Sequence, residues 1–324
     1  MSGSVYAGID IGGTKTAVLL SADPPATISR VEFPTLPEEG PRRALDLIVA
    51  RLREALAAAA CTNADLKGIG VSCGGPLDRN TGVIQAPPNL WTWVDIPIAS
   101  MLQDEFGAPC SLENDANAGA VAEHRFGAGK GTRNMVFLTM GTGLGAGIII
   151  DGRLYAGTNG MAGEIGHVRL TRSGPVGYRK AGSVEGWASG GGMAQLAAKV
   201  VAGAIKRGEK TLLAEFSELP ITARDVNEAA RQGDALAIKM IRSMGRRLGE
   251  GLAILVDILN PERIVIGGLA MRMGDMLLDP ARRVMRRESV PASAAVCEIV
   301  PACLGERIGD VAALCIALGY CKES

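Results

Sequence analysis

The chain opens with the stretch that decides its fold, VYAGIDIGGTKTAVLL at Val5–Leu20, and the same pattern returns as MVFLTMGTGLGAGIII at Met135–Ile150. Each copy has an apolar strand with one polar residue near its end, Asp10 or Thr139, then a turn of glycines and threonines, then a second apolar run. Glycine permits the positive φ of a tight turn and lets backbone N–H groups approach a ligand closely. Two such turns could hold the polyphosphate of a nucleotide from both sides, which indicates phosphoryl transfer.

Composition limits the class of protein. With 324 residues, 47% of them hydrophobic, the chain is long enough for two domains, and the repeated hairpin favours that division. Because 34 basic residues balance 34 acidic ones, we expect no nucleic-acid or membrane partner. The N-terminus lacks the features of a signal peptide, and the apolar run Val311–Tyr320 is too short to span a bilayer. The seven cysteines form no C-x-x-C pair, as expected for a cytoplasmic protein with free thiols.

The hydrophobic pattern outside the hairpins predicts alternating helices and strands. The expected helices are Pro41–Ala60, Ile98–Phe106, Ala116–Phe126, Gly190–Arg207, Asp234–Leu259, Met273–Arg287 and one that begins near Asp310. The expected strands are Lys67–Cys73, Cys110–Leu112, Arg263–Ile266 and Val296–Val300, with irregular loops at Thr81–Pro97 and Gly152–Gly186. This order predicts an α/β fold with mixed sheets. We expect a small N-terminal lobe at 1–118 and a large C-terminal lobe at 119–308, with a last helix, about 309–322, that packs back on the first lobe.

Two other phosphate-binding motifs do not fit the glycine turns. A dinucleotide fingerprint needs a helix after the turn, whereas the apolar strand residues Ile148–Ile150 follow the second turn here. The chain has no G-x-x-x-x-G-K-[ST] sequence, so a P-loop is also excluded. A single hairpin of this kind would be read as an ordinary tight turn, and the matching pair is what favours a functional role.

Five stretches in the same order resemble the ROK (repressor, open reading frame, kinase) family of bacterial sugar kinases and regulators. They are GIDIGGTK at Gly8–Lys15, LENDAN at Leu112–Asn117, LTMGTGLGAG at Leu138–Gly147, AGEIGH at Ala162–His167, and Asn260–Gly268. The resemblance implies an actin-like (ribonuclease H-like) fold with two lobes around a cleft. It also implies transfer of the ATP γ-phosphoryl group to a hexose hydroxyl, usually at C6, with Mg²⁺.

The resemblance also implies a set of nucleotide-binding residues. Asp10 would help to hold hydrated Mg²⁺, and Gly268 would lie against the adenosine. The residues expected to line the phosphates are Gly12, Gly13, Thr14 and Lys15 on one side and Thr139, Gly141, Thr142 and Gly143 on the other.

The expected acceptor site begins at Asn114-Asp115, just before a predicted helix. Sugar hydroxyls both donate and accept hydrogen bonds, so their site needs carboxylates, amides and imidazoles. One of the pair could simply cap the helix. The resemblance assigns both to the site, with Asp115 as the general base that takes the proton from the attacking hydroxyl. It further implies sugar contacts from Gly75, Glu164, His167 and Glu185, and Asn89 is an additional candidate; a core role for His167 is the alternative.

The chain departs from the family at a zinc site. Many ROK kinases place three zinc-binding cysteines after the histidine, and here those positions are Val176, Tyr178 and Ser183. Zinc prefers thiolate and imidazole ligands, so we expect no structural zinc. Packing around Pro175, Tyr178 and Trp187 is the expected replacement, and a hydrogen bond would have to orient the His167 ring.

The sequence leaves several functions open. An ATP-dependent hexose kinase of the glucokinase type is favoured, and an N-acetylhexosamine or fructose kinase is the alternative among enzymes. A sugar-responsive transcription regulator is disfavoured because the chain reaches Asp10 without a helix-turn-helix, and a catalytically inactive sugar sensor is disfavoured because Asp10 and Asp115 are both present. The family is often dimeric or tetrameric, so we expect a homo-oligomer, such as a homodimer. Whether polyphosphate can replace ATP stays open.

Overall fold

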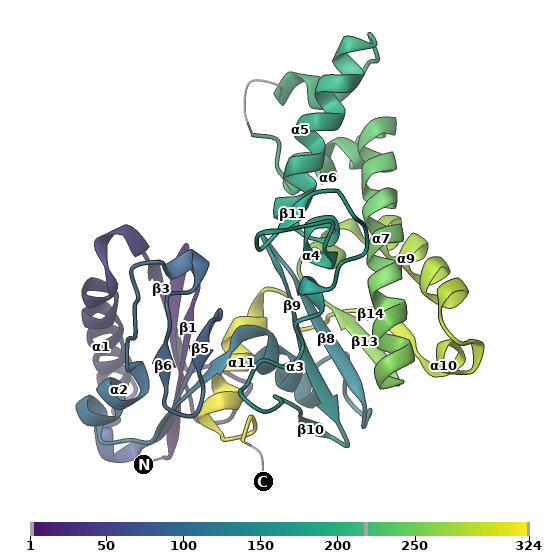
Figure 1. Ribbon diagram of the computed structural model, residues 1–324. Helices are drawn as coiled ribbons and strands as arrows, with labels where there is room; N and C mark the ends of the chain where they lie inside the picture. The colour runs from purple at the N-terminus through teal and green to yellow at the C-terminus, as the bar shows by residue number, and fades with distance from the viewer. Residues whose placement is uncertain (1–2, 217–219, 323–324) are drawn as a thin grey trace. The chain divides into compact units, whose positions relative to one another are not determined.

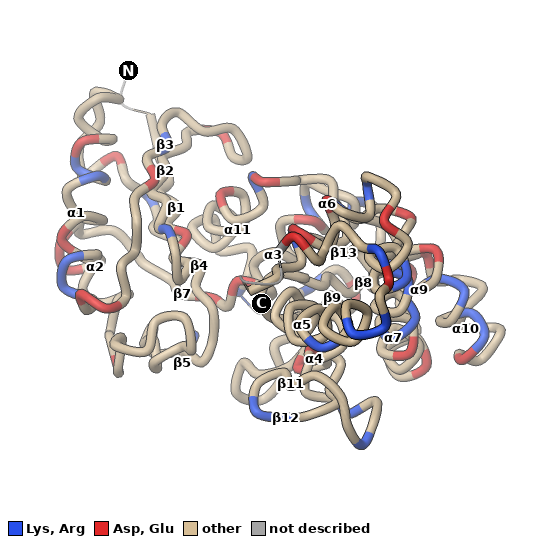
Figure 2. The backbone as a smooth tube through the Cα atoms, turned by 90° about the horizontal axis from the view of Figure 1, so that it is seen from above, with Lys and Arg blue, Asp and Glu red and all other residues tan. Residues whose placement is uncertain are grey.

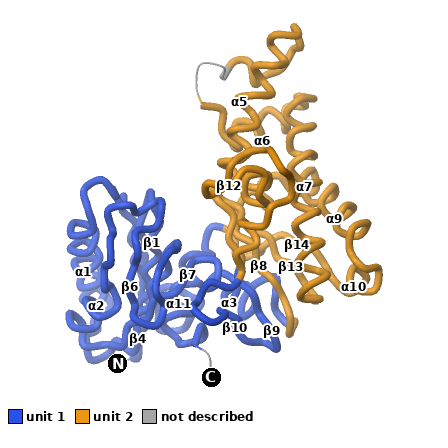
Figure 3. Tube along the Cα trace, in the orientation of Figure 1, with its two compact units in different colours: residues 1–131, 147–162, 306–324 blue, residues 132–146, 163–305 orange. Residues whose placement is uncertain are grey.

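A computed structural model describes residues 3–216 and 220–322. The chain forms two compact units (Figure 3). Unit 1 comprises residues 1–131, 147–162 and 306–324, and unit 2 comprises residues 132–146 and 163–305. Both basic and acidic residues occur in each of the two units (Figure 2).

The sheet of unit 1 has five strands in the order β3-β2-β1-β4-β7. The strands are β1 (Val5–Ile11), β2 (Lys15–Ser21), β3 (Ser29–Pro34), β4 (Leu66–Cys73) and β7 (Cys110–Asn114). The first three are antiparallel neighbours, whereas β4 runs parallel to β1 and β7 parallel to β4. The sheet is therefore mixed, and three of its strands end at the same edge.

Helices cover both faces of this sheet (Figure 1). Apolar side chains of α1 (Pro41–Ala58) and α2 (Ile98–Phe106) form a core with alternate residues of β1, such as Ile9. The other face carries α11 (Ile308–Ala317), which lies so close that a Cβ on Gly70 would be 2.1 Å from the Ala313 carbonyl oxygen. Glycine is required there because any side chain would displace the helix.

The alanine-rich helix α3 (Asp115–Phe126) follows β7 directly. It packs on β9 (Leu144–Ile150) at Gly147, where a Cβ would lie 2.5 Å from the Ala116 carbonyl oxygen. Small residues on both partners explain this close approach, and the packing fixes the helix whose first turn carries Asp115.

The second sheet repeats the topology of the first. Its order is β10-β9-β8-β13-β14, with β8 (Met135–Met140), β10 (Arg153–Leu154), β13 (Arg263–Ile266) and β14 (Glu298–Pro301). Here β13 lies parallel to β8 and β14 parallel to β13, as β4 and β7 do beside β1. The two hairpins recognised in the sequence thus occupy equivalent places in two equivalent sheets.

Helices account for most of the rest of unit 2. They are α4 (Val184–Ala188), α5 (Gly190–Lys206), α6 (Ala223–Arg231), α7 (Ala235–Leu259), α8 (Leu269–Met273), α9 (Asp275–Glu288) and α10 (Pro291–Val296). Helices α7 and α9 pack closely at Gly245, where a Cβ would lie only 2.3 Å from the Leu277 carbonyl oxygen. Their apolar faces form the core of the unit with β8 and β13.

Short elements complete the fold. The remaining strands are β5 (Leu77–Asp78), β6 (Val83–Ile84), β11 (Val176–Gly177) and β12 (Lys180–Ala181). The single-turn helices are η1 (Pro37–Glu39), η2 (Asn63–Asp65), η3 (Pro88–Leu90), η4 (Ile165–His167), η5 (Leu212–Phe216) and η6 (Gly305–Arg307). No helix within the described residues is long and apolar enough to cross a membrane.

The structure confirms the α/β fold with mixed sheets and both hairpins. The expected helices and strands are present with small shifts at their ends. Helices α6, α8 and α10 and strand β3 were not expected, and the loop region Gly152–Gly186 contains the hairpin β11–β12 and the start of α4.

Candidate active site

The parallel strands of unit 1 bring two carboxylates to one edge of the sheet. Ile11 lies beside Cys73, and Cys73 lies beside Asn114, so β1, β4 and β7 end in one row. Asp10 is the penultimate residue of β1, and Asp115 follows the last residue of β7. The carboxyl ends of parallel strands are a common place for ligands because they leave polar groups at an open edge.

The two carboxylates influence each other. Loss of hydration, followed by the negative charge of Asp115, raises the pKa of Asp10 to about 6. Asp115 is accessible to solvent, but the protein around it removes part of its hydration and raises its pKa as well. Two carboxylates with raised pKa values at one strand edge are typical of a functional site.

Asp10 also lies against the first turn of α11. A Cβ on Gly309 would be 2.2 Å from Oδ2 of Asp10, so only glycine fits beside the carboxylate. The negative charge of nearby Asp310 adds to the rise in the pKa of Asp10. The sequence analysis did not single out Gly309 or Asp310, because neither belongs to the glycine turns.

Asn114 caps the helix that carries Asp115. Its Oδ1 accepts hydrogen bonds from the backbone N–H groups of Ala116 (3.0 Å) and Asn117 (3.3 Å). Gly75 is close by, since a Cβ there would lie 3.5 Å from Nδ2 of Asn114. Asn114 is therefore the residue that caps the helix, whereas Asp115 occupies the first helical position and is exposed.

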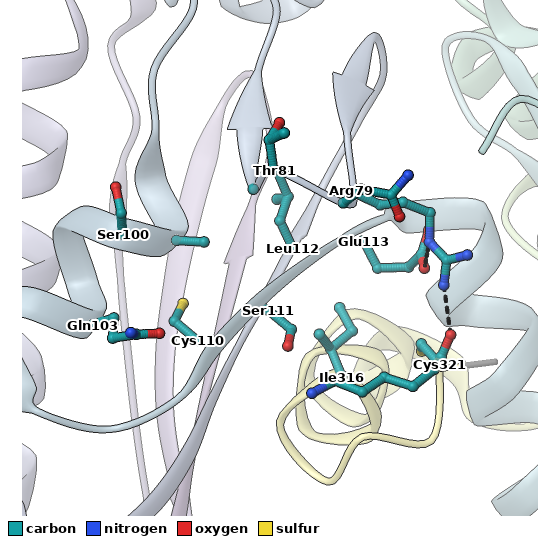
Figure 4. Close-up of a pocket in the computed structure, with 14 residues that line it drawn as sticks. Arg79, Thr81, Ser100, Gln103, Cys110, Ser111, Leu112, Glu113, Ile316 and Cys321 are labelled. Atoms are coloured by element: carbon teal, nitrogen blue, oxygen red, sulfur yellow. Dashed lines mark hydrogen bonds and ion pairs between the residues drawn. The ribbon is translucent and has the colours of Figure 1, made fainter. Parts of the chain in front are cut away.

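A buried carboxylate, Glu113, fixes the turn before Asp115. One oxygen accepts hydrogen bonds from the Asn114 backbone N–H (3.0 Å) and from Nδ2 of Asn117 (3.0 Å). The other pairs with Nε of Arg79 at 2.8 Å, and Arg79 also donates to the Cys321 carbonyl oxygen at 2.6 Å. Burial raises the pKa of Glu113, and the Arg79 charge opposes that rise. Arg79, Glu113 and Cys321 are among the residues that line a pocket of about 600 Å³ (Figure 4).

The first glycine turn, Gly12–Thr14, is exposed and tightly supported. The Gly12 N–H donates to the Lys15 carbonyl oxygen (2.9 Å), and the Thr35 hydroxyl donates to the Gly12 carbonyl oxygen (2.7 Å). A Cβ on Gly13 would lie 2.5 Å from Cβ of Asn89, so the structure brings these two predicted site residues together.

The side chain of Lys15 joins a surface network beside this turn. Its ammonium group contacts Glu32 at 2.9 Å, and Glu32 also contacts Arg30 at 2.8 Å. Arg30 in turn pairs with Asp310 at 2.8 Å. Because the Lys15–Glu32 pair is exposed to water, it contributes little to stability, and the ammonium group remains able to turn toward a phosphate.

The second glycine turn, Gly141–Gly143, is anchored by the first residues of α5. The N–H groups of Gly190 and Gly191 donate to the carbonyl oxygens of Gly141 (2.8 Å) and Thr142 (2.9 Å). Thr139 is the penultimate residue of β8, the place that Asp10 has in β1. In the sequence, the three glycines after Ser189 predicted only the start of a helix, and their contact with the second turn was not predicted.

Close approach of neighbouring side chains explains Gly13 and Gly143 but not Gly141. None of Gly12, Gly13, Gly141 and Gly143 has a positive φ, so left-handed backbone is not the reason for glycine at these positions. A side chain on Gly13 would meet Asn89, whereas Gly141 faces open space and leaves its backbone accessible. By contrast, Gly268 does have a φ of 66°, and a Cβ there would lie 2.1 Å from the Met140 carbonyl oxygen.

Glu185 lies against the second turn. Its Oε2 accepts a hydrogen bond from the Leu144 N–H at 3.0 Å, and a Cβ on Gly143 would lie 2.9 Å from the same oxygen. A Cβ on Gly177 would lie 2.8 Å from its other oxygen. The structure therefore brings Glu185 together with one of the predicted phosphate-binding residues.

Glu164 and His167 share one short segment, and both are accessible. Nε2 of His167 is 3.9 Å from Oε2 of Glu164, which is beyond hydrogen-bond distance. The imidazole and the Tyr178 ring instead meet edge to face, with 5.1 Å between the centroids. The expected hydrogen bond to orient His167 is therefore replaced by a ring contact.

The residues at the family's zinc positions do not fit zinc. The backbone of Val176 pairs with the Gln195 amide, and Ser183 caps α4 by accepting from the Gly186 N–H at 3.1 Å. Near them, Nε1 of Trp187 donates to the Thr171 hydroxyl at 2.7 Å. Among the residues that the structure describes, no three His, Cys, Asp or Glu side chains are grouped to hold a metal ion.

Three comparisons with known proteins agree with these features. The ROK family model matches residues 6–319. The chain is 35% identical to the glucokinase of Halalkalibacterium halodurans, over 96% of this chain and 94% of that one. It is 30% identical to the xylose repressor of Caldicellulosiruptor bescii, over 87% of this chain and 70% of the repressor.

A solved structure matches over the whole length. The ROK family glucokinase of Streptomyces griseus, crystallised with glucose and AMPPNP, superposes with a TM-score of 0.79 at 31% identity. The match covers 98% of this chain and all of the glucokinase. The fold is thus the actin-like fold of ROK kinases, and the chain belongs to the ROK family.

Proposed function

We propose that this protein is an ATP-dependent hexose kinase that phosphorylates glucose or a related hexose, with Asp115 as the general base. The observation that carries the proposal is the pair Asp10 and Asp115 at one strand edge, each with a raised pKa. The glucokinase relatives and the glucokinase structure with glucose and AMPPNP support hexose phosphorylation.

The carboxylates of unit 1 fit a bound Mg²⁺. Magnesium in phosphoryl-transfer sites takes one or two carboxylates and completes its shell with water and substrate phosphates. Asp10 would hold the hydrated ion, and the neighbouring charges that raise its pKa make a cation favourable there. When bound, the ion would offset negative charge on the ATP phosphates.

Asp115 has the chemistry of a general base. It is accessible to a substrate, and its raised pKa strengthens it as a proton acceptor. It would take the proton of the sugar hydroxyl while that oxygen attacks the γ-phosphorus. The cap that Asn114 provides and the contacts of Glu113 hold the first turn of α3, so the carboxylate is positioned before substrate binds.

Other residues would bind and orient the substrates. Backbone groups of the two exposed glycine turns would contact the ATP phosphates, as in other glycine-rich phosphate sites. The proposed phosphate contacts are Gly12, Gly13, Thr14, Lys15, Thr139, Gly141, Thr142 and Gly143, with Gly268 at the adenosine. The proposed sugar contacts are Gly75, Asn89, Asn114, Glu164, His167 and Glu185.

A turnover assay tests the proposal. ADP release is measured for purified protein with Mg²⁺ and a panel of hexoses, N-acetylhexosamines and fructose, with ATP or polyphosphate as the donor. We expect saturable turnover with glucose or a related hexose and ATP. Turnover only with an N-acetylhexosamine or fructose would favour the alternative kinase. No turnover with any sugar, together with specific DNA binding, would favour a regulator like the xylose repressor.

The pH dependence of the reaction should reflect the carboxylates of unit 1. Because the pKa values of Asp10 and Asp115 are raised, both groups gain protons at a higher pH than ordinary carboxyls do. We therefore expect kcat/KM for the sugar to fall with decreasing pH as Asp115 gains a proton, and to do so at a higher pH than an ordinary carboxyl would cause. The profile is measured from pH 5 to pH 8 under conditions in which the protein stays folded. A rate that stays constant down to pH 5 would contradict this assignment.

Purified protein should contain no stoichiometric zinc. Val176, Tyr178 and Ser183 offer no thiolate, and His167 alone cannot hold the metal. Elemental analysis after dialysis against a chelator and then metal-free buffer measures the content. One zinc per chain that disappears in His167→Ala would show that a zinc site exists.

A further inference from the structure

The β11–β12 hairpin has an unfavourable turn. Gly177 pairs with Lys180, which leaves Tyr178 and Arg179 as the two turn residues, with φ values of 35° and 66°. Two-residue hairpin turns with positive φ at both positions strongly prefer Asn-Gly, because larger side chains are strained there. Tyr178 and Arg179 therefore lower the stability of the hairpin. A functional role that outweighs this cost would explain why they occupy the turn.

The Tyr178 ring is directed at His167. The two rings meet edge to face at an interplanar angle of 70°, with centroids 5.1 Å apart. This is a favourable geometry for aromatic pairs. Tyr178 is 53% exposed, so its ring contributes little to a core, and the imidazole is its ring partner in the structure.

The hairpin is fixed in place around His167. Nζ of Lys180 donates to the His167 carbonyl oxygen at 2.8 Å. In β11, the Val176 N–H donates to Oε1 of Gln195 (2.9 Å), and Nε2 of Gln195 donates to the Val176 carbonyl oxygen (2.8 Å). Glu164 is too distant for a hydrogen bond to the ring, and the hairpin contacts His167 through both the Tyr178 ring and the Lys180 ammonium group.

We infer that Tyr178 is a positioning residue for sugar recognition: the strained β11–β12 turn holds its ring against His167 and so fixes the imidazole toward a sugar hydroxyl. This inference rests on the proposed function, in which His167 contacts the sugar. Tyr178 acts only through His167, because an orientated imidazole loses less freedom when it binds a hydroxyl. The turn thereby restrains His167, as a bound zinc ion would in family members that have the three zinc-binding cysteines.

Four variants test the inference through the sugar KM, the ATP KM, kcat and the thermal midpoint. Tyr178→Ala should raise the sugar KM by roughly 2- to 12-fold, the range for loss of one aromatic pair, with kcat and the ATP KM nearly unchanged. Tyr178→Phe keeps the ring and should keep the sugar KM. Arg179→Gly relieves one strained position without touching the ring, so it should raise the thermal midpoint and leave the sugar KM unchanged.

The fourth variant separates positioning from a merely structural role. Tyr178→Asn combined with Arg179→Gly gives the preferred turn sequence, so the thermal midpoint should rise while the sugar KM rises as in Tyr178→Ala. A structural role would instead make stability and sugar affinity change together. A Tyr178→Ala variant with the wild-type sugar KM would overturn the inference.

A comparison with His167→Ala distinguishes failure of the inference from failure of the proposed function. His167→Ala should raise the sugar KM, and adding Tyr178→Ala to it should cause no further rise, because Tyr178 acts through the imidazole. Fully additive effects would overturn the positioning role while leaving the kinase intact. If wild-type protein turns over no sugar at all, the proposed function itself fails.

Discussion

Asp115→Asn should lower kcat for hexose phosphorylation by about 10²–10⁴-fold, the usual contribution of a general base. The amide has nearly the same shape as the carboxylate but cannot accept the hydroxyl proton at neutral pH. Its oxygen can still accept the Ala116 N–H that Asp115 now binds at 2.8 Å, so α3 should begin as before. The assay is ADP release at saturating sugar and ATP, with nucleotide binding measured by calorimetry.

A matched control separates catalysis from charge. Asp104→Asn removes one negative charge from an exposed position of α2 and should leave kcat and nucleotide affinity unchanged. Asp115→Asn should also bind nucleotide with nearly the wild-type affinity, because Asp115 is not among the proposed phosphate contacts. Activity of Asp115→Asn within a few-fold of wild type would rule out this residue as the base.

Arg79→Met should lower the free energy of unfolding by about 3–5 kcal/mol, the cost of leaving a buried charge without its partner. The Glu113 side chain is 2% exposed and the Arg79 side chain 14%, so the carboxylate left behind would be poorly hydrated. Burial already raises the pKa of Glu113, and loss of Arg79 raises it further. The cost should therefore shrink as the pH falls, because proton uptake neutralises the remaining carboxylate. Urea unfolding at pH 5.5 and pH 7.5 measures both effects.

Two further variants serve as controls for Arg79→Met. Adding Glu113→Gln removes the stranded charge but keeps an oxygen for the Asn114 N–H, so the double variant should be more stable than Arg79→Met alone. Arg42→Met breaks a pair with Asp46 whose side chains are 84% and 63% exposed, and it should have little effect. An Arg79→Met protein as stable as wild type would show that the pair does not hold the start of α3.

Much of the fold could be predicted because the informative patterns are local. The repeated hairpins, the amphipathic helix at Pro41 and the long helix that ends at Asn260 all follow from periodicity and turn residues. Helix α6 was missed although Thr222 and Asp225 form a capping box at its start. Its nine residues lie among polar segments, and the apolar stripe was too short to stand out.

The candidate site was only partly predictable. Asp10 and Asp115 were predicted through the family resemblance, and the alignment of β1, β4 and β7 places them at one edge of the sheet. Glu113 was not predicted as a site residue although it lies in the LENDAN stretch, because a glutamate in a strand carries no sign of its distant partner Arg79. The turn at Tyr178 likewise has no sequence signal, since neither of its residues favours positive φ.

The most direct test of the central claim is the crystal structure of the protein with glucose and a non-hydrolysable ATP analogue. The account predicts a carboxylate oxygen of Asp115 within about 2.6–3.2 Å of one sugar hydroxyl, and that hydroxyl oxygen directed at the γ-phosphorus. A sugar bound with every hydroxyl beyond hydrogen-bond reach of Asp115 would contradict it.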